Sequence, residues 1–502
     1  MSVFRPLPLG QRIPGSVHSV SCSLPTMRSV VGYEEKDPNV TRQLTSGYPR
    51  FVVHPFARQL ADHLAKNLGL AGHTLWLASS ASMAGELASH LGAASARVVS
   101  AEGVHGVAHP AADTELGSRA KQFLQHVGGF ISSREAEDHL VRLGLLAAAE
   151  PETLFHGDAV AEVKRHLRRA FPAAAETDLF LANSGMNAIY AAFRALSELQ
   201  AARGRTLWIQ LGWLYLDTIA ILKKFSAAPA DYVFLRDVFD RAAIERVFAE
   251  HGPRIAGLLT EVPTNPLIQT PDVPWLAGLA RRHGAALILD PSVASPFAVD
   301  LLSHGDVATA SLTKYTASDG DIIAGVAAVN PASPHAAALR KKLPTLLEPA
   351  YPRDLARLAA QIGRTETVLA RIEENTPRVA AFLEKHPGVR EVFWARRPES
   401  RENFARVARA PGASGAVISF TLRGPLDKFY DRLRLPKGPS FGITTTLICP
   451  FIYLAHYDLV TSEAGRAELA ASGIDPGLLR LSVGTEPADE IIAALAEALE
   501  SP

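Results

Sequence analysis

The feature that most constrains the fold is an alternation of apolar strands and helices between about residues 158 and 330. The strand candidates are short and apolar, as in LFLA, TLWIQL, IAGLLTE and AALILD, and helical periodicity separates them. A strand that is apolar on both faces is typical of a parallel sheet covered by helices on both sides. The sequence therefore predicts an α/β domain with a mostly parallel sheet.

Three further regions flank or interrupt this domain. Residues 1–55 are rich in Pro and Gly and lack a long helical period, so we expect an extended N-terminal arm. The large domain is expected over residues 56–335, with an insertion at about 75–150 that mixes short apolar runs with loops. Residues 336–502 predict a separate, smaller α+β domain, because a helical stretch precedes strand candidates and a terminal helix.

Charge and cysteine content exclude several classes of protein. Lys and Arg total 51 and Asp and Glu total 51, so the formal net charge is zero, which argues against a nucleic-acid-coating or membrane-coating protein. Only two cysteines occur, and the histidines are scattered without an H-E-x-x-H motif, so we expect no disulfide framework and no metal site. No apolar run has the length of a signal peptide or a membrane span, which predicts a cytoplasmic protein.

Polar residues follow four of the predicted strands. Gly185 and Met186 begin a helix, Asn265 lies in the rigid turn TEVPTNP, Asp290 closes LILD, and Lys314 follows SLT. Taken singly, these features indicate an ordinary turn, a helix cap and a surface lysine. Open α/β sheets, however, bind ligands at the carboxyl ends of their strands, where all four segments are expected.

Together the four segments match the needs of pyridoxal 5'-phosphate. Lys314 would bond the cofactor covalently, and Asp290 would keep the pyridine nitrogen protonated, so that the ring acts as an electron sink. The hydroxyls of Ser311 and Thr313 and the first amides of the helix, at Gly185 and Met186, would hold the phosphate.

The motifs SGMNAI, TEVPTNPL, LILDPSVASP, SLTKY and RLSVGTE resemble those of the Cys/Met-metabolism family of pyridoxal-phosphate enzymes, in the same order and rough spacing. The runs IPGSVHSVSCSLPTM, GYPRFVVHP and AKQFLQHVGGFISSREAE are most similar to the long, fungal-type cystathionine γ-synthases. The resemblance covers most of the chain. It implies the aspartate-aminotransferase-like fold (fold type I), with a seven-stranded type of sheet, small amino-acid substrates, and a homodimer or dimer-of-dimers tetramer.

The resemblance also implies a role for each matching residue. Lys314 is the catalytic lysine, Arg480 in RLSVG binds the substrate α-carboxylate, and Ser440 lies near that carboxylate. The implied cofactor ligands are Asp290, Ser292, Ser311, Thr313, Gly185, Met186 and Asn265.

Two departures from the family pattern bear on the chemistry. The family tyrosine that stacks on the cofactor ring has no direct counterpart; the local sequence Gly-Trp-Leu-Tyr offers Trp213 or Tyr215, and we favour Trp213. Pro439 stands where the family often has a glutamate that helps to choose the substrate.

In this family an N-terminal Tyr-x-Arg reaches the cofactor phosphate of the neighbouring subunit, so the active sites are shared. Tyr48 and Arg50 match that motif, although Arg50 lies 135 residues before Gly185 (185 − 50). Arg134 lies only 51 residues before Gly185 (185 − 134), a more typical gap, but lacks the tyrosine. We favour Tyr48 and Arg50 and keep Arg134 as the alternative.

Two reactions fit these motifs. The first is γ-replacement on an O-acylated homoserine by a thiol such as cysteine, with the Lys314 amine moving protons at Cα and Cβ. The second is γ-elimination by a lyase, which releases a keto acid and ammonia. A non-catalytic scaffold is a third interpretation, and the intact set of Lys314, Asp290 and Arg480 argues against it.

Overall fold

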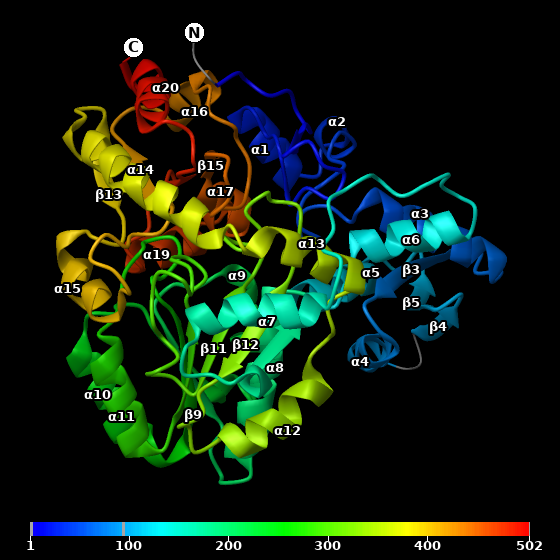
Figure 1. Cartoon of the computed structure of the whole chain (residues 1–502), viewed down its shortest axis with the longest axis horizontal. Coiled ribbons are helices and arrows are strands. Elements are labelled where there is room, and N and C mark those ends of the chain that lie inside the picture. The colour runs from blue at the N-terminus through cyan, green and yellow to red at the C-terminus, as the bar shows by residue number, and fades with distance from the viewer. Residues whose placement is uncertain (1–3, 93–95, 501–502) are drawn as a thin grey trace.

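The computed structural model describes residues 4–92 and 96–500 (Figure 1). Residues 1–3, 93–95 and 501–502, which fall in the predicted arm, insertion and C-terminal domain, lie outside the described residues. Among the described helices, none is long and apolar enough to cross a membrane.

A seven-stranded sheet forms the centre of the large domain, as the alternating pattern predicts. Its strand order is β6-β12-β11-β10-β9-β7-β8, and β12 alone among these strands runs antiparallel to its neighbours. The strands are β6 (Leu179–Ala182), β7 (Leu207–Leu211), β8 (Tyr232–Leu235), β9 (Ile255–Glu261), β10 (Ala286–Asp290), β11 (Val307–Ser311) and β12 (Gly325–Val329). Every residue of β9 and β10 is buried, as expected for strands with helices on both faces.

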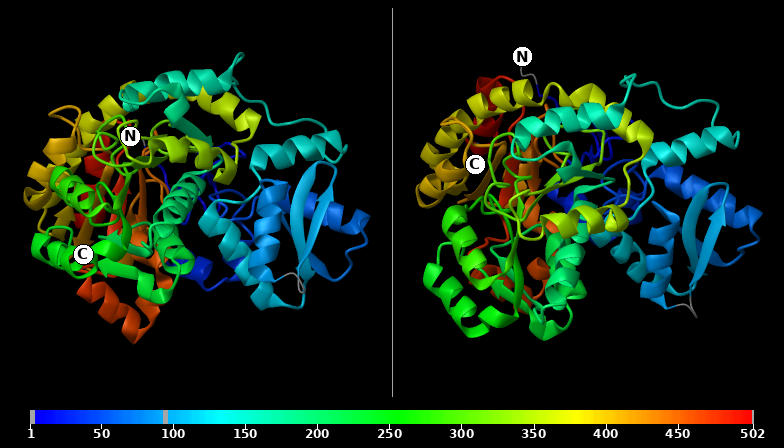
Figure 2. Two further views of the ribbon diagram at one scale, coloured as in Figure 1. Left: turned by 90° about the horizontal axis from the view of Figure 1, so that it is seen from below. Right: turned by 60° about the horizontal axis from the view of Figure 1, so that its bottom comes forward.

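The helices of this domain precede, separate and follow the strands in sequence, and they cover the sheet (Figures 1 and 2). They are α7 (Ala159–Ala170), α8 (Gly185–Ala201), α9 (Leu216–Phe225), α10 (Arg241–His251), α11 (Val273–His283) and α12 (Ala336–Leu346). Short 3₁₀ turns occupy Glu176–Asp178, Pro229–Asp231 and Gly252–Arg254.

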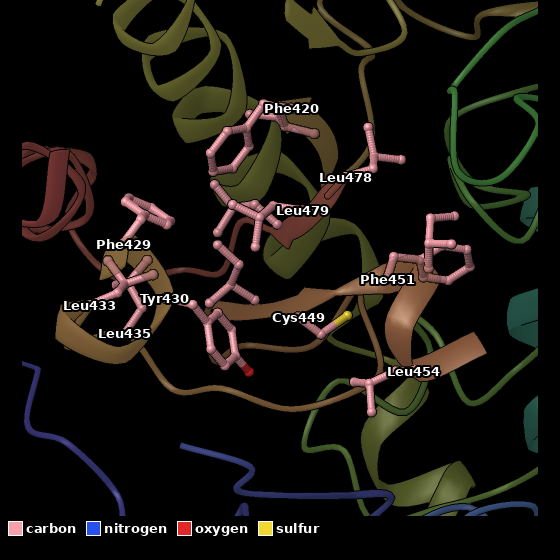
Figure 3. Close-up of a cluster of buried hydrophobic side chains, with 14 of the residues drawn as sticks. Phe420, Phe429, Tyr430, Leu433, Leu435, Cys449, Phe451, Leu454, Leu478 and Leu479 are labelled. Carbon is pink, nitrogen blue, oxygen red and sulfur yellow. The ribbon is translucent and has the colours of Figure 1, made fainter. Parts of the chain in front are cut away.

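The C-terminal domain is built on a four-stranded antiparallel sheet in the order β13-β14-β16-β15. Its strands are β13 (Val389–Phe393), β14 (Val417–Leu422), β15 (Leu447–Pro450) and β16 (Leu479–Ser482). Its helices are α13 (Pro352–Ile362), α14 (Thr365–Lys385), α15 (Pro398–Val407), α16 (Leu426–Arg432), α17 (Phe451–Ala455), α18 (Tyr457–Thr461), α19 (Glu463–Ala471) and α20 (Ala488–Glu500). A cluster of buried side chains, among them Phe420, Tyr430 and Leu479, fills the space beneath this sheet (Figure 3).

The N-terminal segment is more structured than its Pro- and Gly-rich sequence predicts. It pairs β1 (Arg12–Ile13) with β2 (Ser21–Cys22) and continues through α1 (Met27–Glu34) and α2 (Pro38–Thr41). Buried residues such as Leu24 and Val30 join the hydrophobic cluster of the C-terminal domain. Packing, rather than a local helical period, therefore holds this segment.

The insertion and the helix before it fold as a compact α+β unit at one side of the molecule (Figures 1 and 2). Three antiparallel strands in the order β3-β5-β4 pack against four helices. The unit comprises α3 (Pro55–Asn67), β3 (His73–Ala78), α4 (Ala81–Leu91), β4 (Arg97–Ala101), β5 (Val104–Pro110), α5 (Thr114–Val127) and α6 (Ser133–Arg142).

Candidate active site

The start of α8 forms a cradle of backbone amides. Ser184 caps the helix by accepting a hydrogen bond from the Asn187 amide at 3.1 Å. Gly185 approaches β11 so closely that an added Cβ would lie 2.8 Å from the Cβ of Ser311. Only glycine fits this contact, which brings the first amides of α8 beside Ser311. The amides of a helix start and adjacent hydroxyls suit an anionic phosphate.

Asp290 ends β10 as a buried carboxylate without an ion-pair partner among the described residues. Its side chain is 5% exposed, and its Oδ1 accepts a hydrogen bond from the Ser292 amide at 2.7 Å. The Ser292 hydroxyl in turn accepts a hydrogen bond from the Ser311 amide at 2.8 Å. Burial raises the pKa of Asp290 to about 6, and the hydrogen bonds of Ser292 oppose that shift. A protonated ring nitrogen would supply the cation that this site lacks.

Glu261 is a site residue that our reading of the sequence missed. It ends β9 directly beside Asp290 in the parallel pairing. Its Oε1 accepts a hydrogen bond from the Tyr215 amide at 2.6 Å, and its Oε2 has no hydrogen bond within the described residues. Burial, followed by the neighbouring Asp290, raises the pKa of Glu261 well above its usual range. The site therefore opposes ionisation of Glu261 more strongly than that of Asp290. Each of these acids is the last residue of an apolar strand, and that shared position was the signal in the sequence that could have identified Glu261.

Lys314 is a buried amine. Its Nζ donates a hydrogen bond to the Ser440 hydroxyl at 3.2 Å and lies 4.2 Å from the ring centre of Tyr48 and 4.8 Å from that of Phe441. Burial and then the charge of Arg480 lower its pKa well below the usual range. An uncharged amine can attack an aldehyde and can accept a proton from carbon.

Arg480 and Asn265 face the cavity from different domains. Arg480 lies on β16, and its Nη1 donates a hydrogen bond to the side-chain oxygen of Asn265 at 3.2 Å. The guanidinium also packs over Phe451, 4.4 Å from the ring centre. Among the described residues no carboxylate pairs with Arg480, so its planar fork is available to a substrate carboxylate.

The structure separates the two candidates for the ring-stacking residue. Tyr215 lines the cavity and hydrogen-bonds Arg50 and Asp217 through its hydroxyl. Trp213, which we favoured from the sequence, does not line the cavity. Its indole N–H donates to His456 at 3.2 Å, and its ring packs in the hydrophobic cluster beside Phe234. The chain leaves the extended strand conformation after β7, with a φ of 78° at Gly212, so Trp213 and Tyr215 lie in the loop before α9 and do not share one side.

The two candidates for the phosphate arm also lie apart. Tyr48 lines the cavity of its own chain, and its hydroxyl lies 2.6 Å from that of Ser440. Arg50 lines the same cavity, and its Nη2 donates to the Leu454 carbonyl at 2.6 Å.

Arg134 does not line this cavity. It is 1% exposed and pairs with three carboxylates, those of Glu152, Asp354 and Asp321, at 2.8, 3.0 and 3.6 Å. Its guanidinium is therefore committed to an ion-pair cluster.

These groups surround a cavity of about 150 Å³ between the central sheet, the C-terminal domain and the N-terminal segment. The predicted residues that line it are Tyr48, Arg50, Gly185, Met186, Tyr215, Asn265, Asp290, Ser292, Ser311, Thr313, Lys314, Ser440 and Arg480. A buried lysine with a lowered pKa, a buried aspartate without an ion-pair partner among the described residues and the glycine-dependent cradle at α8 fit pyridoxal 5'-phosphate.

Residues 168–500 match the family of Cys/Met metabolism PLP-dependent enzymes. The chain belongs to that family. Its cofactor is therefore pyridoxal 5'-phosphate, and it is a PLP-dependent enzyme of Cys/Met metabolism. The family predicted from the five motifs is confirmed.

Two curated relatives span nearly the whole chain. An L-2-amino-4-chloropent-4-enoate dechlorinase/desaturase of Streptantibioticus cattleyicolor is 40% identical over 97% of this chain and 97% of its own length. The cystathionine gamma-synthase of Neurospora crassa is 28% identical over 99% of this chain and 98% of its own length.

Solved structures confirm fold type I. Cystathionine gamma synthase from Xanthomonas oryzae pv. oryzae matches with a TM-score of 0.57 at 23% identity, covering 68% of this chain and 86% of that one. Cystathione gamma lyase (CalE6) from Micromonospora echinospora matches with a TM-score of 0.56 at 24% identity, covering 66% of this chain and 87% of that one.

Proposed function

We propose that this enzyme removes hydrogen halide from a γ-halogenated amino acid, with L-2-amino-4-chloropent-4-enoate as the leading candidate substrate. The candidate substrate is the one in the name of the 40% identical relative, which is called a dechlorinase/desaturase. It replaces γ-replacement on an O-acylated homoserine as the first candidate.

The observation that carries the proposal is the apolar lining of the cavity around Ser440. This wall is formed by Phe51, Pro439, Phe441, Cys449, Phe451, Leu454 and Ala455. The charged residues that the structure places around the cavity are Arg50, Glu261, Asp290, Lys314 and Arg480. With Arg480 assigned to the substrate α-carboxylate and Arg50 to the cofactor phosphate, no cation in this lining is left for a charged acyl group or for the carboxylate of incoming cysteine. Burying such a charge unpaired is costly, whereas a carbon-bound chlorine is apolar.

The residues around the cavity have separate roles in the proposed reaction. Arg480 and Asn265 orient the substrate, and Asp290 holds the protonated ring nitrogen of the cofactor. Pyridoxal 5'-phosphate supplies the electron sink for charge that develops at Cα. The Lys314 amine accepts the Cα proton and transfers protons at neighbouring carbons, and Tyr215 packs against the ring.

The elimination needs no oxidant. The carbon–chlorine bond at Cγ breaks with its electron pair on chloride, and one proton leaves carbon for solvent by way of Lys314. The product is the amino acid less HCl, with one additional unsaturation. Chloride is a weak base and needs no general acid, so the apolar wall beside the leaving group does not hinder its departure.

Replacement of a γ-substituent by a thiol is the second candidate. The resemblance to the Neurospora crassa cystathionine gamma-synthase over nearly the whole chain supports it. The γ-lyase outcome, with release of a keto acid and ammonia, would follow if the unsaturated product were hydrolysed in the same site.

Initial rates on matched substrates test the proposal. We expect chloride release from L-2-amino-4-chloropent-4-enoate at a kcat/KM at least about tenfold above that for O-acetylhomoserine with cysteine. Pro439→Glu restores the acid that the family often has at this position, and we expect it to slow chloride release because it places a carboxylate in the apolar wall. Faster turnover of O-acetylhomoserine with cysteine by the unaltered enzyme would refute the proposal.

A further inference from the structure

We propose that Phe451 and Phe441 are positioning residues. Their rings hold the guanidinium of Arg480 ready for the substrate carboxylate, in place of the acidic partner that a buried arginine usually has. This inference deepens the proposed function, because it rests on Arg480 as the residue that binds the carboxylate in that site. It does not depend on the identity of the leaving group.

Arg480 is a buried cation without an ion pair among the described residues. It is 7% exposed, and burial lowers its pKa. The carboxyl group whose charge acts on it is Glu261, and burial raises the pKa of Glu261 well above its usual range. Cys449 lies directly opposite in the pairing of β15 with β16 and hydrogen-bonds the guanidinium, but burial raises the pKa of this thiol too. A buried charge is costly unless other groups compensate it.

Two phenylalanine rings supply this compensation. The central carbon of the guanidinium lies 4.4 Å from the ring centre of Phe451 and 5.2 Å from that of Phe441. The face of an aromatic ring carries partial negative charge, and it attracts a cation most strongly where water is excluded. The rings therefore stabilise the charge of Arg480 without occupying its N–H donors, which an acidic partner would occupy.

The backbone of the C-terminal domain fixes both rings. Phe451 is the first residue of α17, as Figure 3 shows, and its amide donates to the Leu478 carbonyl at 3.0 Å. Phe441 is followed by Gly442, whose amide donates to the Ser482 hydroxyl at 3.0 Å. The two rings are therefore held on the same domain as Arg480.

Asn265 fixes one edge of the guanidinium. Its side-chain oxygen accepts a hydrogen bond from Arg480 Nη1 at 3.2 Å. A planar group that is bonded at one edge and packed against rings does not rotate freely, so its remaining donors keep a fixed direction. Such preorganised donors bind a carboxylate with a smaller loss of freedom. We therefore expect the rings to contribute to substrate affinity.

Phe451 is the ring to change in an experiment. The Phe441 ring also lies 4.8 Å from Lys314 Nζ, so its removal would disturb the catalytic amine as well. Among the described residues, the Phe451 ring lies over Arg480 and over no other cation.

Phe420 provides a matched control. It is buried in the same hydrophobic cluster as Phe451, and Figure 3 shows the two rings apart. Phe420 pairs with Leu479 across the sheet, whereas Arg480 pairs with the preceding residue of β14. Because side chains alternate along a strand, the Phe420 ring lies on the other face of the sheet from Arg480.

Binding of L-alanine to the holoenzyme, followed through the absorbance of the cofactor, tests the inference without a chlorinated substrate. We expect Phe451→Leu to raise the dissociation constant of L-alanine by about tenfold. Propylamine, an amine without a carboxylate, should bind the variant and the unaltered enzyme equally. Phe420→Leu should lower stability and leave both dissociation constants unchanged. Unchanged L-alanine affinity in Phe451→Leu, an equal loss for both ligands, or the same loss in Phe420→Leu would overturn the inference.

Fluorinated phenylalanines at position 451 separate the charge of the ring from its packing, and they test the inference even if Phe451→Leu does not fold. Fluorine withdraws negative charge from the ring face and changes the size of the ring little. The dissociation constant of L-alanine should rise from phenylalanine through 4-fluorophenylalanine to 3,4,5-trifluorophenylalanine, with the melting temperature unchanged. Equal affinity across the series would mean that the ring only fills space, and the inference would be wrong.

The positioning role and the proposed function can fail separately. If L-alanine affinity follows the ring as described but no chloride is released from L-2-amino-4-chloropent-4-enoate, the proposed elimination is wrong and the positioning role holds. If chloride is released and L-alanine affinity does not respond to Phe451, only the positioning role is wrong.

Discussion

Burial sets the charges at the two ends of the cofactor site. Burial and then the charge of Arg480 lower the pKa of Lys314 and so favour its neutral amine. Asp290 is held without a cation, so the cofactor-free site stores an unfavourable charge that binding relieves. The sequence indicated both residues through their places at strand ends. It could not indicate the pairing of Asp290 with Glu261, because strand register decides which side chains are adjacent.

Replacing Lys314 with Ala should reduce turnover by at least about a thousandfold, because the residue both bonds the cofactor and moves protons. The variant should still bind pyridoxal 5'-phosphate, but without a covalent bond. Borohydride reduction of the unaltered enzyme, followed by peptide mapping, should place the cofactor on Lys314. Labelling of another lysine would show that the assignment is wrong.

Asp290→Asn should make the cofactor-free protein more stable at pH 8. The folded-state pKa of Asp290 is raised from 3.8 to about 6, so ionisation costs stability as the pH rises through that range. A shift of this size corresponds to about 3 kcal/mol above pH 6, and none of it is present below pH 3.8. Denaturant titrations at pH 4 and pH 8 should show a stability gap between the two proteins only at pH 8.

The same Asp290→Asn variant should lose turnover by about a hundredfold or more, since a neutral amide does not hold the ring nitrogen protonated. If the variant and the unaltered protein differed in stability by the same amount at pH 4 and pH 8, and turnover stayed near normal, Asp290 would have only a structural role.

Tyr215→Phe should lower turnover by about tenfold and weaken cofactor binding, because Arg50 and Asp217 lose the hydroxyl between them. Trp213→Phe is the matched control: its ring lies in the hydrophobic cluster, so it should affect stability and leave cofactor affinity unchanged. If cofactor affinity fell in Trp213→Phe but not in Tyr215→Phe, Trp213 would be the ring-stacking residue that we favoured from the sequence. Sequence spacing alone left the choice open, because both residues follow the same strand.

At the scale of elements, the helices and strands of the central domain followed from hydrophobic periodicity, whereas the N-terminal segment did not. Helix α1 forms where the sequence shows no long period, and buried contacts with the C-terminal domain stabilise it. Short helices depend on such packing more than on their own propensity. Arg134, a candidate for the phosphate from its spacing, instead joins α6 to α13 through Asp354.

Arg134→Ala should destabilise the fold by about 3 kcal/mol, since it leaves the buried carboxylate of Asp354 without its cation and removes one ion pair of Glu152, which keeps its pair with Arg353. Cofactor affinity per folded molecule should not change. Arg165→Ala removes an exposed pair with Glu162 and should leave stability almost unchanged. Thermal unfolding would measure stability, and cofactor titration would measure affinity. A normal melting temperature with lost cofactor affinity in Arg134→Ala would indicate that Arg134 binds the cofactor phosphate.

At the scale of the whole molecule, the order of motifs was enough to predict the family and fold type I. The arrangement of the insertion was not predictable from that order, because its place depends on contacts between segments far apart in the sequence, such as Gln125 and Asp217. Whether the chain forms a dimer or a tetramer stays a prediction.

The outcome of the reaction is tested most directly by the mass of the product formed from L-2-amino-4-chloropent-4-enoate in the presence of excess cysteine. The apolar wall of the cavity has no cation for a second amino acid, so we expect a product that has lost HCl and contains no sulfur, in the same yield with and without cysteine. The Lys314→Ala protein is the control and should leave the substrate unchanged. A product that carries the added mass of cysteine as a thioether would contradict elimination and establish γ-replacement in its place.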